Sequence, residues 1–286
     1  MKKVILLIIF VIYLFLPVLQ DKSSDKLRIW VLNIGQGDAI LVRTTSGKNI
    51  LIDTGPDETL LTELGEVLPY FDRKIDYFIV SHPHYDHIGA VKELFDRYEV
   101  EKVIWFPVDY YNAEYSWLRE YSVDNPEKFL IKGSGENFTI DNLELLTVWP
   151  ILKSDLEERD FRNVNNASFV FLLKYKNFEV FFGGDSEHEQ EEEYLDELKQ
   201  IMLENNIDRV EYLKASHHCS DTSNSKELLE VLQSEVVTCG VGLDNKFGHP
   251  KEEVLVRLEN MNVKIYRTDL NGRVYIVSNG EDYEVE

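Results

Sequence analysis

Four side chains that can bind metal ions lie within six consecutive residues of the sequence. They are His82, His84, Asp86 and His87, in the stretch "SHPHYDHIGA". In an extended segment alternate side chains share one face, so His82 and His84 can converge on one ion. The chain then turns, and Asp86 with His87 can face a second ion. Imidazole and carboxylate ligands suit zinc, iron or manganese better than calcium or magnesium.

Further metal-capable residues follow later apolar runs that we interpret as strands. His217 and His218 lie in "KASHHCSDTS", His249 lies in "FGHP", and Asp185 ends "FFGGD", where glycines allow a close backbone approach. Strand ends that converge on one edge of a sheet form a site, so we expect these residues to meet. We interpret His188, inside an acidic helical run, as incidental.

Short β-branched and aromatic runs separated by turn residues predict many strands. These runs cover residues 27–34, 39–44, 49–55, 75–80, 102–108, 143–149, 168–175, 178–184, 210–216 and 235–242. Helical patterns cover residues 57–68, 89–98, 187–203, 225–233 and 251–260, and the polar and aromatic segment 109–136 is expected to hold one helix near the site. Strands outnumber helices and many are apolar on both faces, which predicts an α/β fold with helices packed outside the sheets.

The first twenty residues form a separate element. Two lysines precede an uncharged apolar run over residues 4–19, a pattern typical of an export signal. As a helix this run would span about 24 Å, somewhat less than the ~30 Å hydrocarbon core. No small-x-small cleavage pattern follows it, so we favour a membrane anchor with the protein outside the cytoplasm over a cleaved signal peptide. Residues 27–286 are expected to form a single domain.

Charge and cysteine content narrow the functional classes. The formal net charge of −22 argues against a protein that holds nucleic acid mainly through a basic surface. Bound metal could still supply local positive charge to a phosphodiester site. Only Cys219 and Cys239 are present, so we expect no disulfide framework. Cys239 is interpreted as a core residue and Cys219 as a small buried residue, the alternative being a thiol that tunes the site.

The motifs resemble those of a known family. "HPHYDH" matches the HxHxDH signature of the metallo-β-lactamase family, whose fold is an αββα sandwich. The ordered set "LNIGQGDAILV", "ILIDTG", "NNASFVF", "FFGGD", "LKASHHCSDTS" and "VGLDNKFGHP" resembles the hydrolase-like domain of the ComEC branch, which serves DNA uptake. The phosphorylcholine esterases of bacterial surfaces share the double-histidine element and mark another branch.

This resemblance implies a ligand set for two divalent ions, zinc or manganese. His82 and His84 would bind the first ion, Asp86 and His87 the second, and Asp185 would bridge them. One histidine of the double-histidine element, His218 rather than His217, would complete the second site.

The resemblance also implies roles around the ions. His217 would contact a phosphoryl oxygen, and His249 would be an alternative ligand or a substrate contact. Many family members carry another histidine where Asn165, Asn166 and Ser168 stand in this chain. We therefore expect an open position at the first ion, with these three residues facing the substrate.

Two aspartates have more than one interpretation. Asp53, in "LIDTG", either accepts a hydrogen bond from a ligand histidine or shapes a turn. Asp38, in "GQGDA", either lines the site or caps a loop.

The expected reaction is hydrolysis by a metal-activated water, with Asp86, Asp185, His217 and His249 in the catalytic set. The favoured activity is an extracytoplasmic phosphodiesterase or nuclease, with single-stranded DNA as one candidate substrate. The alternatives are hydrolysis of another ester, such as a choline phosphoester or a lactone, and a non-catalytic metal-binding protein.

Overall fold

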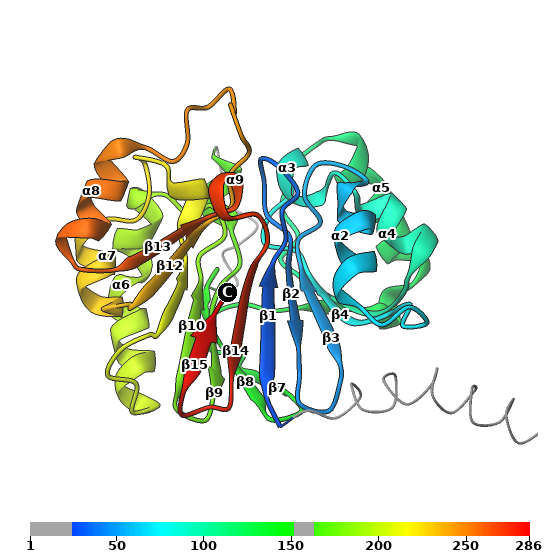
Figure 1. The fold of residues 1–286 in the computed structure, drawn as a ribbon. Coiled ribbons are helices and arrows are strands. Elements are labelled where there is room, and N and C mark those ends of the chain that lie inside the picture. The colour runs from blue at the N-terminus through cyan, green and yellow to red at the C-terminus, as the bar shows by residue number, and fades with distance from the viewer. Residues whose placement is uncertain (1–24, 152–162) are drawn as a thin grey trace, which may run out of the picture.

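The computed structural model describes residues 25–151 and 163–286. In these residues two sheets pack face to face and helices cover the outer face of each sheet (Figure 1). This arrangement is the αββα sandwich that the sequence predicts. The proposed anchor at residues 1–20 lies outside the described part of the chain, within which no helix is long and apolar enough to span a bilayer.

The first sheet has eight strands among the described residues, in the order β15-β14-β1-β2-β3-β4-β5-β6. Their bounds are β1 Leu27–Val31, β2 Ile40–Arg43, β3 Asn49–Ile52, β4 Lys74–Ile79, β5 Glu99–Trp105, β6 Phe129–Ile131, β14 Val274–Ser278 and β15 Tyr283–Val285. Strands β1 to β3 form an antiparallel meander, and β3 to β6 are parallel. Strand β14 returns from the second half of the chain to pair with β1, and β15 pairs with β14.

The second sheet has seven strands in the described residues, in the order β13-β12-β11-β10-β9-β8-β7. Their bounds are β7 Phe138–Ile140, β8 Leu143–Trp149, β9 Val170–Tyr175, β10 Phe178–Phe182, β11 Tyr212–Lys214, β12 Val236–Cys239 and β13 Lys264–Arg267. Strands β10 to β13 are parallel. Parallel neighbours end at the same edge, so the loops after β10, β11 and β12 lie together.

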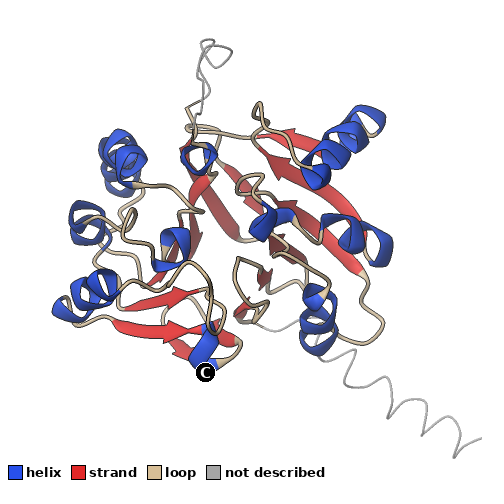
Figure 2. Cartoon of the chain, turned by 90° about the horizontal axis from the view of Figure 1, so that it is seen from above, coloured by secondary structure: helices blue, strands red, loops and turns tan. Residues whose placement is uncertain are grey.

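Helices cover both outer faces, as the view from above shows (Figure 2). Their bounds are α2 Thr59–Val67, α3 Tyr85–Ile88, α4 Val91–Arg97, α5 Ala113–Asp124, α6 His188–Glu204, α7 Lys226–Leu232, α8 Glu252–Asn260 and α9 Thr268–Asn271, with 3-10 turns η1 Pro126–Lys128, η3 Val164–Ala167 and η4 Ser216–Cys219. Helices α2, α4 and α5 lie on the first sheet, and α6, α7 and α8 lie on the second. Helix α5 is the one expected within residues 109–136.

Three apolar layers hold these elements together. The layer between the two sheets includes Phe169, Phe171 and Phe182, whose rings pack at 5.0–5.3 Å between centroids. Burying one such side chain stabilises the fold by roughly 1.5–3 kcal/mol. On α6, Tyr194 and Leu198 face the second sheet and are fully buried, in agreement with the apolar stripe of that acidic helix. The packed sandwich therefore holds the loops at the ends of its strands in defined positions.

Candidate metal centre

The metal-capable residues lie in loops at one edge of the two sheets. Asp53 follows β3, the segment 81–84 follows β4, and Asp185 follows β10. The turn η4, with His217 and His218, follows β11. Strands β3 and β4 are parallel, and so are β10 and β11, so these loops leave each sheet at the same edge. The structure therefore brings together residues that lie more than a hundred positions apart in the sequence.

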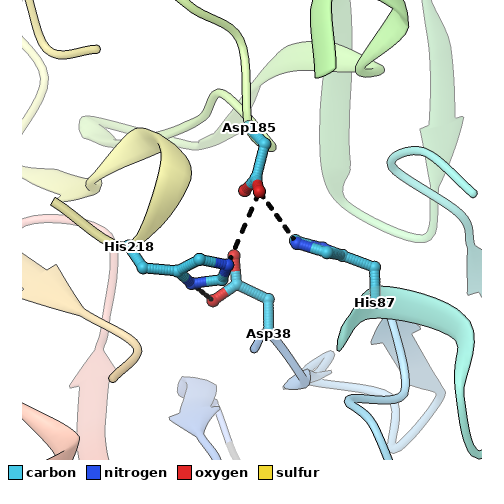
Figure 3. A group of neighbouring side chains, drawn as sticks. All are labelled: Asp38, His87, Asp185 and His218. Atoms are coloured by element: carbon cyan, nitrogen blue, oxygen red, sulfur yellow. Dashed lines mark ion pairs between the residues drawn. The ribbon is translucent and has the colours of Figure 1, made fainter. Parts of the chain in front are cut away.

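The histidine side chains converge on Asp185. Its Oδ2 lies 3.2 Å from Nε2 of His87 and 3.5 Å from Nε2 of His218 (Figure 3). The Nε2 atoms of His82 and His217 lie 3.8 and 3.9 Å from the same oxygen. Burial alone would raise the pKa of Asp185, but His87 and His218 hold that pKa well below its usual range. An ionised carboxylate at this point can serve as a ligand shared between two ions.

The remaining predicted ligands flank this centre on two sides. Nε2 of His82 lies 3.1 Å from Nδ1 of His84, and Oδ2 of Asp86 lies 3.4 Å from Nε2 of His218. Burial, followed by the charge on His87, lowers the pKa of both His82 and His84. Neutral imidazole is the form that binds metal. The structure therefore places His84 beside His82, and Asp86 beside His218.

Several atoms at the centre are buried and have no hydrogen-bond partner among the described residues. They are Nε2 of His87, Oδ1 of Asp185, Oδ1 of Asp38 and both ring nitrogens of His218. Each buried polar atom without a partner costs about 1–3 kcal/mol. One ligand atom from each of these four residues lies within 4.8 Å of the others. His87, Asp185 and His218 of this set are predicted ligands, and nitrogen and oxygen donors of this kind suit a divalent transition metal.

Asp53 orients His87, one of the predicted ligands. Its Oδ2 lies 2.8 Å from Nδ1 of His87, and its Oδ1 accepts a hydrogen bond from the Ser81 backbone N–H at 2.8 Å. The Ser81 hydroxyl donates to Oδ2 at 2.5 Å. Burial lowers the pKa of His87, but Asp185 and Asp53 outweigh that effect and raise it well above its usual value. Of the two interpretations of Asp53, the structure supports the hydrogen-bond acceptor behind a ligand.

The turn that carries His217 and His218 is strained. His217, His218 and Cys219 have φ angles of 50°, 53° and 60°, in the left-handed region that costs non-glycine residues roughly 1–2 kcal/mol each. The side chain of Asn224 holds the start of the turn, accepting from the Ser216 N–H and donating to the Ser216 carbonyl, both at 2.9 Å. Such strain is common at functional sites, where the surroundings enforce it.

Cys219 and Cys239 form a disulfide, with 5.7 Å between their Cα atoms. The sequence-based expectation of two separate buried thiols is therefore wrong, although both residues are buried as expected. The reason is topological: β12 lies beside β11 in the sheet, and this pairing places the end of one strand against the turn after the other. The bond ties the strained turn directly to the sheet.

The three residues expected to face the substrate support the Asp185 loop. The Ser168 hydroxyl is fully buried and accepts the Asp185 backbone N–H at 2.9 Å. Asn165 donates to Oε1 of Glu187 at 2.9 Å, and Asn166 accepts the Glu187 backbone N–H at 3.2 Å. These contacts fix the segment that follows β10. Glu187 was not singled out from the sequence, because a glutamate in an acidic run carries no distinguishing signal.

His249 and His188 lie outside the buried cluster. The ring of His249 lies 5.7 Å from that of His217 and is stacked on Phe247, with 6.0 Å between centroids. Burial, followed by the nearby histidines, lowers the pKa of His249 to about 4. His188 begins α6, is exposed, and lines a separate surface groove of about 490 Å³ with Lys226.

Residues 32–239 match the Metallo-beta-lactamase superfamily. The chain is 25% identical to "ComE operon protein 3" of Bacillus subtilis, over 91% of this chain and 34% of that protein. It is also 25% identical to "Recombination protein 2" of Haemophilus influenzae, over 95% of this chain and 31% of that protein. The chain thus spans about a third of the length of these relatives.

Solved structures share the fold. The metallo-beta-lactamase fold protein YhfI from Bacillus subtilis superposes with a TM-score of 0.55 at 11% identity, over 85% of this chain and 96% of that one. The diiron beta-hydroxylase CmlA from Streptomyces venezuelae gives the same TM-score at 16% identity, over 88% of this chain and 54% of that one. The chain belongs to the metallo-beta-lactamase superfamily, as its motifs predict. It is also 24% identical to "Competence protein ComA" of Neisseria gonorrhoeae, over 87% of this chain and 32% of that protein.

Proposed function

We propose that this member of the superfamily is an extracytoplasmic, metal-dependent phosphodiesterase that cleaves nucleic acid strands. The observation that carries the proposal is the convergence of His82, His87, His217 and His218 on one oxygen of Asp185. A carboxylate surrounded in this way suits a dinuclear site, in which one oxygen-rich group serves both ions.

The chain offers a ligand set for each ion. His82 and His84 would hold the first ion, and Asp86, His87 and His218 the second, with Asp185 shared. When bound, the two ions would polarise a phosphoryl oxygen and lower the pKa of a water molecule.

His217 is positioned to act on the substrate. Its ring is partly exposed, and its Nδ1 lies 3.2 Å from Thr222 Oγ1 and 3.5 Å from Glu187 Oε1. These contacts engage one ring nitrogen and leave Nε2 directed toward the centre, near Asp185. An imidazole N–H at that place can donate a hydrogen bond to a phosphoryl oxygen and stabilise its developing charge.

Aromatic rings on both sides of the centre favour a nucleic acid substrate. On one side the ring of Tyr110 lies 5.5 Å from that of His84, and the neighbouring Tyr111 is 86% exposed. On the other side Phe247 is 47% exposed and Lys246 Nζ lies 4.9 Å from its ring centre. Exposed rings can stack on bases whatever the sequence, and a lysine beside them can contact phosphate.

The disulfide supports the proposed location. Disulfides persist in oxidising compartments and are rare in the cytosol. Cys219–Cys239 is buried beside the candidate ligands, which agrees with a protein that folds and acts outside the cytoplasm.

One assay tests the proposed activity. Purified protein with added manganese or zinc is incubated with single-stranded DNA, bis(p-nitrophenyl) phosphate, p-nitrophenylphosphorylcholine and a lactone. We expect cleavage of the first two substrates, and no cleavage after chelation. Turnover of only the choline ester or the lactone would favour the alternative ester hydrolases, and no turnover with bound metal would favour a non-catalytic metal-binding protein.

A further inference from the structure

The ionised pair of Asp38 and Lys214 lies at the junction between the two sheets, beside the candidate metal centre. Nζ of Lys214 donates to Oδ2 of Asp38 at 2.7 Å and to the Ala215 carbonyl at 2.9 Å. Asp38 is 3% exposed and Lys214 is 2% exposed. Asp38 precedes β2 of the first sheet, whereas Lys214 ends β11 of the second, so the pair joins the two halves of the sandwich.

The other oxygen of Asp38 faces His218. Oδ1 of Asp38 lies 3.5 Å from Nδ1 of His218, and neither atom has a hydrogen-bond partner among the described residues (Figure 3). The second ring nitrogen of His218, Nε2, faces Asp185 and Asp86 at 3.5 and 3.4 Å. The ring thus directs one nitrogen at the candidate ligands and the other at Asp38.

The backbone around Asp38 is fixed as closely as its side chain. Its N–H donates to the Asp86 carbonyl at 3.2 Å, and its carbonyl accepts the Gly55 N–H at 2.8 Å. A Cβ at Gly37 would lie 2.2 Å from the Asp86 carbonyl oxygen, so glycine permits this approach. The Asp38 loop is therefore held by a backbone hydrogen bond against the segment that carries Asp86 and His87.

The absence of a side chain at Gly240 leaves space for the salt bridge between Asp38 and Lys214. A Cβ there would lie 2.5 Å from Oδ1 of Asp38, 2.9 Å from the Gly37 carbonyl oxygen and 3.4 Å from Cε of Lys214. Gly240 directly follows Cys239, whose disulfide holds the turn that carries His218.

We infer that Asp38, held by Lys214, is a positioning residue for His218 rather than a metal ligand. The Asp38 carboxylate accepts the proton on Nδ1 and so presents Nε2, with its lone pair, to the second ion, as carboxylates behind ligand histidines do. Lys214 holds Oδ2 of Asp38, which leaves Oδ1 facing Nδ1 of His218. The inference rests on the proposed metal-dependent function, in which His218 is a ligand.

Three variants separate positioning from direct ligation. Gly240→Ala displaces Oδ1 of Asp38 and removes no polar group, Lys214→Met frees the other oxygen, and Asp38→Asn keeps the shape of the side chain. Gly65→Ala is the matched control, because a Cβ at Gly65 in α2 meets nothing within 4 Å. Asp38→Asn also guards against a folding failure of the two other variants.

The first measurement uses metal-free protein. Burial lowers the pKa of His218, but Asp185 and Asp38 outweigh that effect and raise it well above its usual value, so nitrogen-15 NMR is recorded at a pH high enough to leave the ring neutral. The proton should then lie on Nδ1 in the wild type and in Gly65→Ala. We expect a mixture of tautomers, or the proton on Nε2, in the Asp38, Lys214 and Gly240 variants. An unchanged tautomer in all three would overturn the inference. Because no metal is present, this result stands even if the proposed function fails.

The second measurement is calorimetric titration with Mn²⁺ or Zn²⁺. All three variants should bind one of the two equivalents about 10–100-fold more weakly than the wild type, the usual effect of losing an orienting partner. Complete loss of that equivalent in Asp38→Asn, with wild-type affinity in Lys214→Met and Gly240→Ala, would identify Asp38 as a ligand and overturn the inference. Wild-type protein that binds no metal would instead refute the proposed function.

Discussion

His87 contacts Asp185 through one ring nitrogen and Asp53 through the other. Nε2 lies 3.2 Å from Oδ2 of Asp185, and Nδ1 lies 2.8 Å from Oδ2 of Asp53. The imidazole is therefore fixed between a carboxylate that faces the centre and one that lies behind it. Three loops, after β3, β4 and β10, depend on this one ring for their relative positions.

Replacement of Asp185 should damage the centre more than replacement of a peripheral ligand. Asp185→Ala removes the carboxylate that four histidines face, so we expect phosphodiester hydrolysis to fall at least about a thousandfold. The fold should persist, because the residue lies in the loop after β10 and does not fill the core. Steady-state kinetics on bis(p-nitrophenyl) phosphate, with circular dichroism of each variant, measure both effects.

His188→Ala is the matched control for that experiment. His188 is exposed at the start of α6 and is not in the buried cluster, so its replacement should leave the rate unchanged. Similar rates for Asp185→Ala and His188→Ala would mean that the site has been placed around the wrong residues.

The protein should bind two transition-metal ions. The ligand groups of His82 with His84, and of Asp86 with His87 and His218, lie on two sides of Asp185. Elemental analysis after reconstitution with excess metal should give two equivalents, and free metal at about 100 times its Kd should stabilise the fold by about 2.7 kcal/mol for each site. A folded protein that never takes up more than one equivalent would exclude the dinuclear mechanism.

The sequence predicts the fold, and the proximity of the metal-capable side chains, for identifiable reasons. The segment from His82 to His87 is local, so residue spacing alone indicates a metal site. The layers follow from apolar runs and helical patterns, which are also local signals. The structure adds the short C-terminal strands β13, β14 and β15, of which β14 returns to pair with β1 in the other half of the chain.

The contacts that support the centre could not be predicted in the same way. Asp38 and Lys214 are 176 positions apart, and their pairing depends on how the two sheets pack. A single lysine within the apolar strand "YLK" was the available signal, since a buried charge needs a partner. Ser168 resembled a substrate contact because the loop sequence does not indicate which way its hydroxyl points.

The disulfide should contribute measurably to stability. It closes a segment whose ends are 20 residues apart, and a loop of that size corresponds to about 3 kcal/mol by the chain-entropy estimate. We expect Cys219→Ser/Cys239→Ser to lower the free energy of unfolding by about 2–4 kcal/mol in urea titrations. Thiol titration of the denatured wild type should find no free thiols before reduction and two after it; two free thiols in freshly purified protein would contradict the bond.

The exposed ring of Phe247 should contribute to the binding of single-stranded DNA and not to the binding of small phosphodiesters. Phe247→Ala should raise the KM for single-stranded DNA about tenfold, since stacking on one base is worth roughly 1–3 kcal/mol. Its kinetics on bis(p-nitrophenyl) phosphate should match the wild type. Leu270→Ala, at a 68% exposed apolar residue of α9, is the control and should alter neither substrate. Equal KM values for DNA in both variants would exclude stacking at Phe247.

Stability at alkaline pH should depend on Glu179. This residue lies near the start of β10, whereas the metal centre lies beyond the end of that strand. Glu179 is 6% exposed, and its backbone N–H donates to Oε2 of Glu211 at 2.9 Å. Burial, followed by the charge of Glu211, raises the pKa of Glu179 to about 8. Lys174 Nζ, at 3.9 Å from Oε1, and Glu144, next to Lys174 in the sheet, also act on it, the lysine lowering the pKa and the glutamate raising it.

The sign of the pH effect follows from these values. The folded protein keeps the Glu179 proton up to about pH 8, whereas the unfolded chain loses it near pH 4.3. Since the folded state binds more protons between these values, stability is greatest below that window and falls as the pH rises through it.

Glu179→Gln cannot ionise, so it should unfold at a higher urea concentration than the wild type at pH 9 and at a similar concentration at pH 4. The control Glu120→Gln, at an exposed residue of α5, should show no such divergence. Parallel stability curves for Glu179→Gln and the wild type from pH 4 to pH 9 would refute a protonated Glu179.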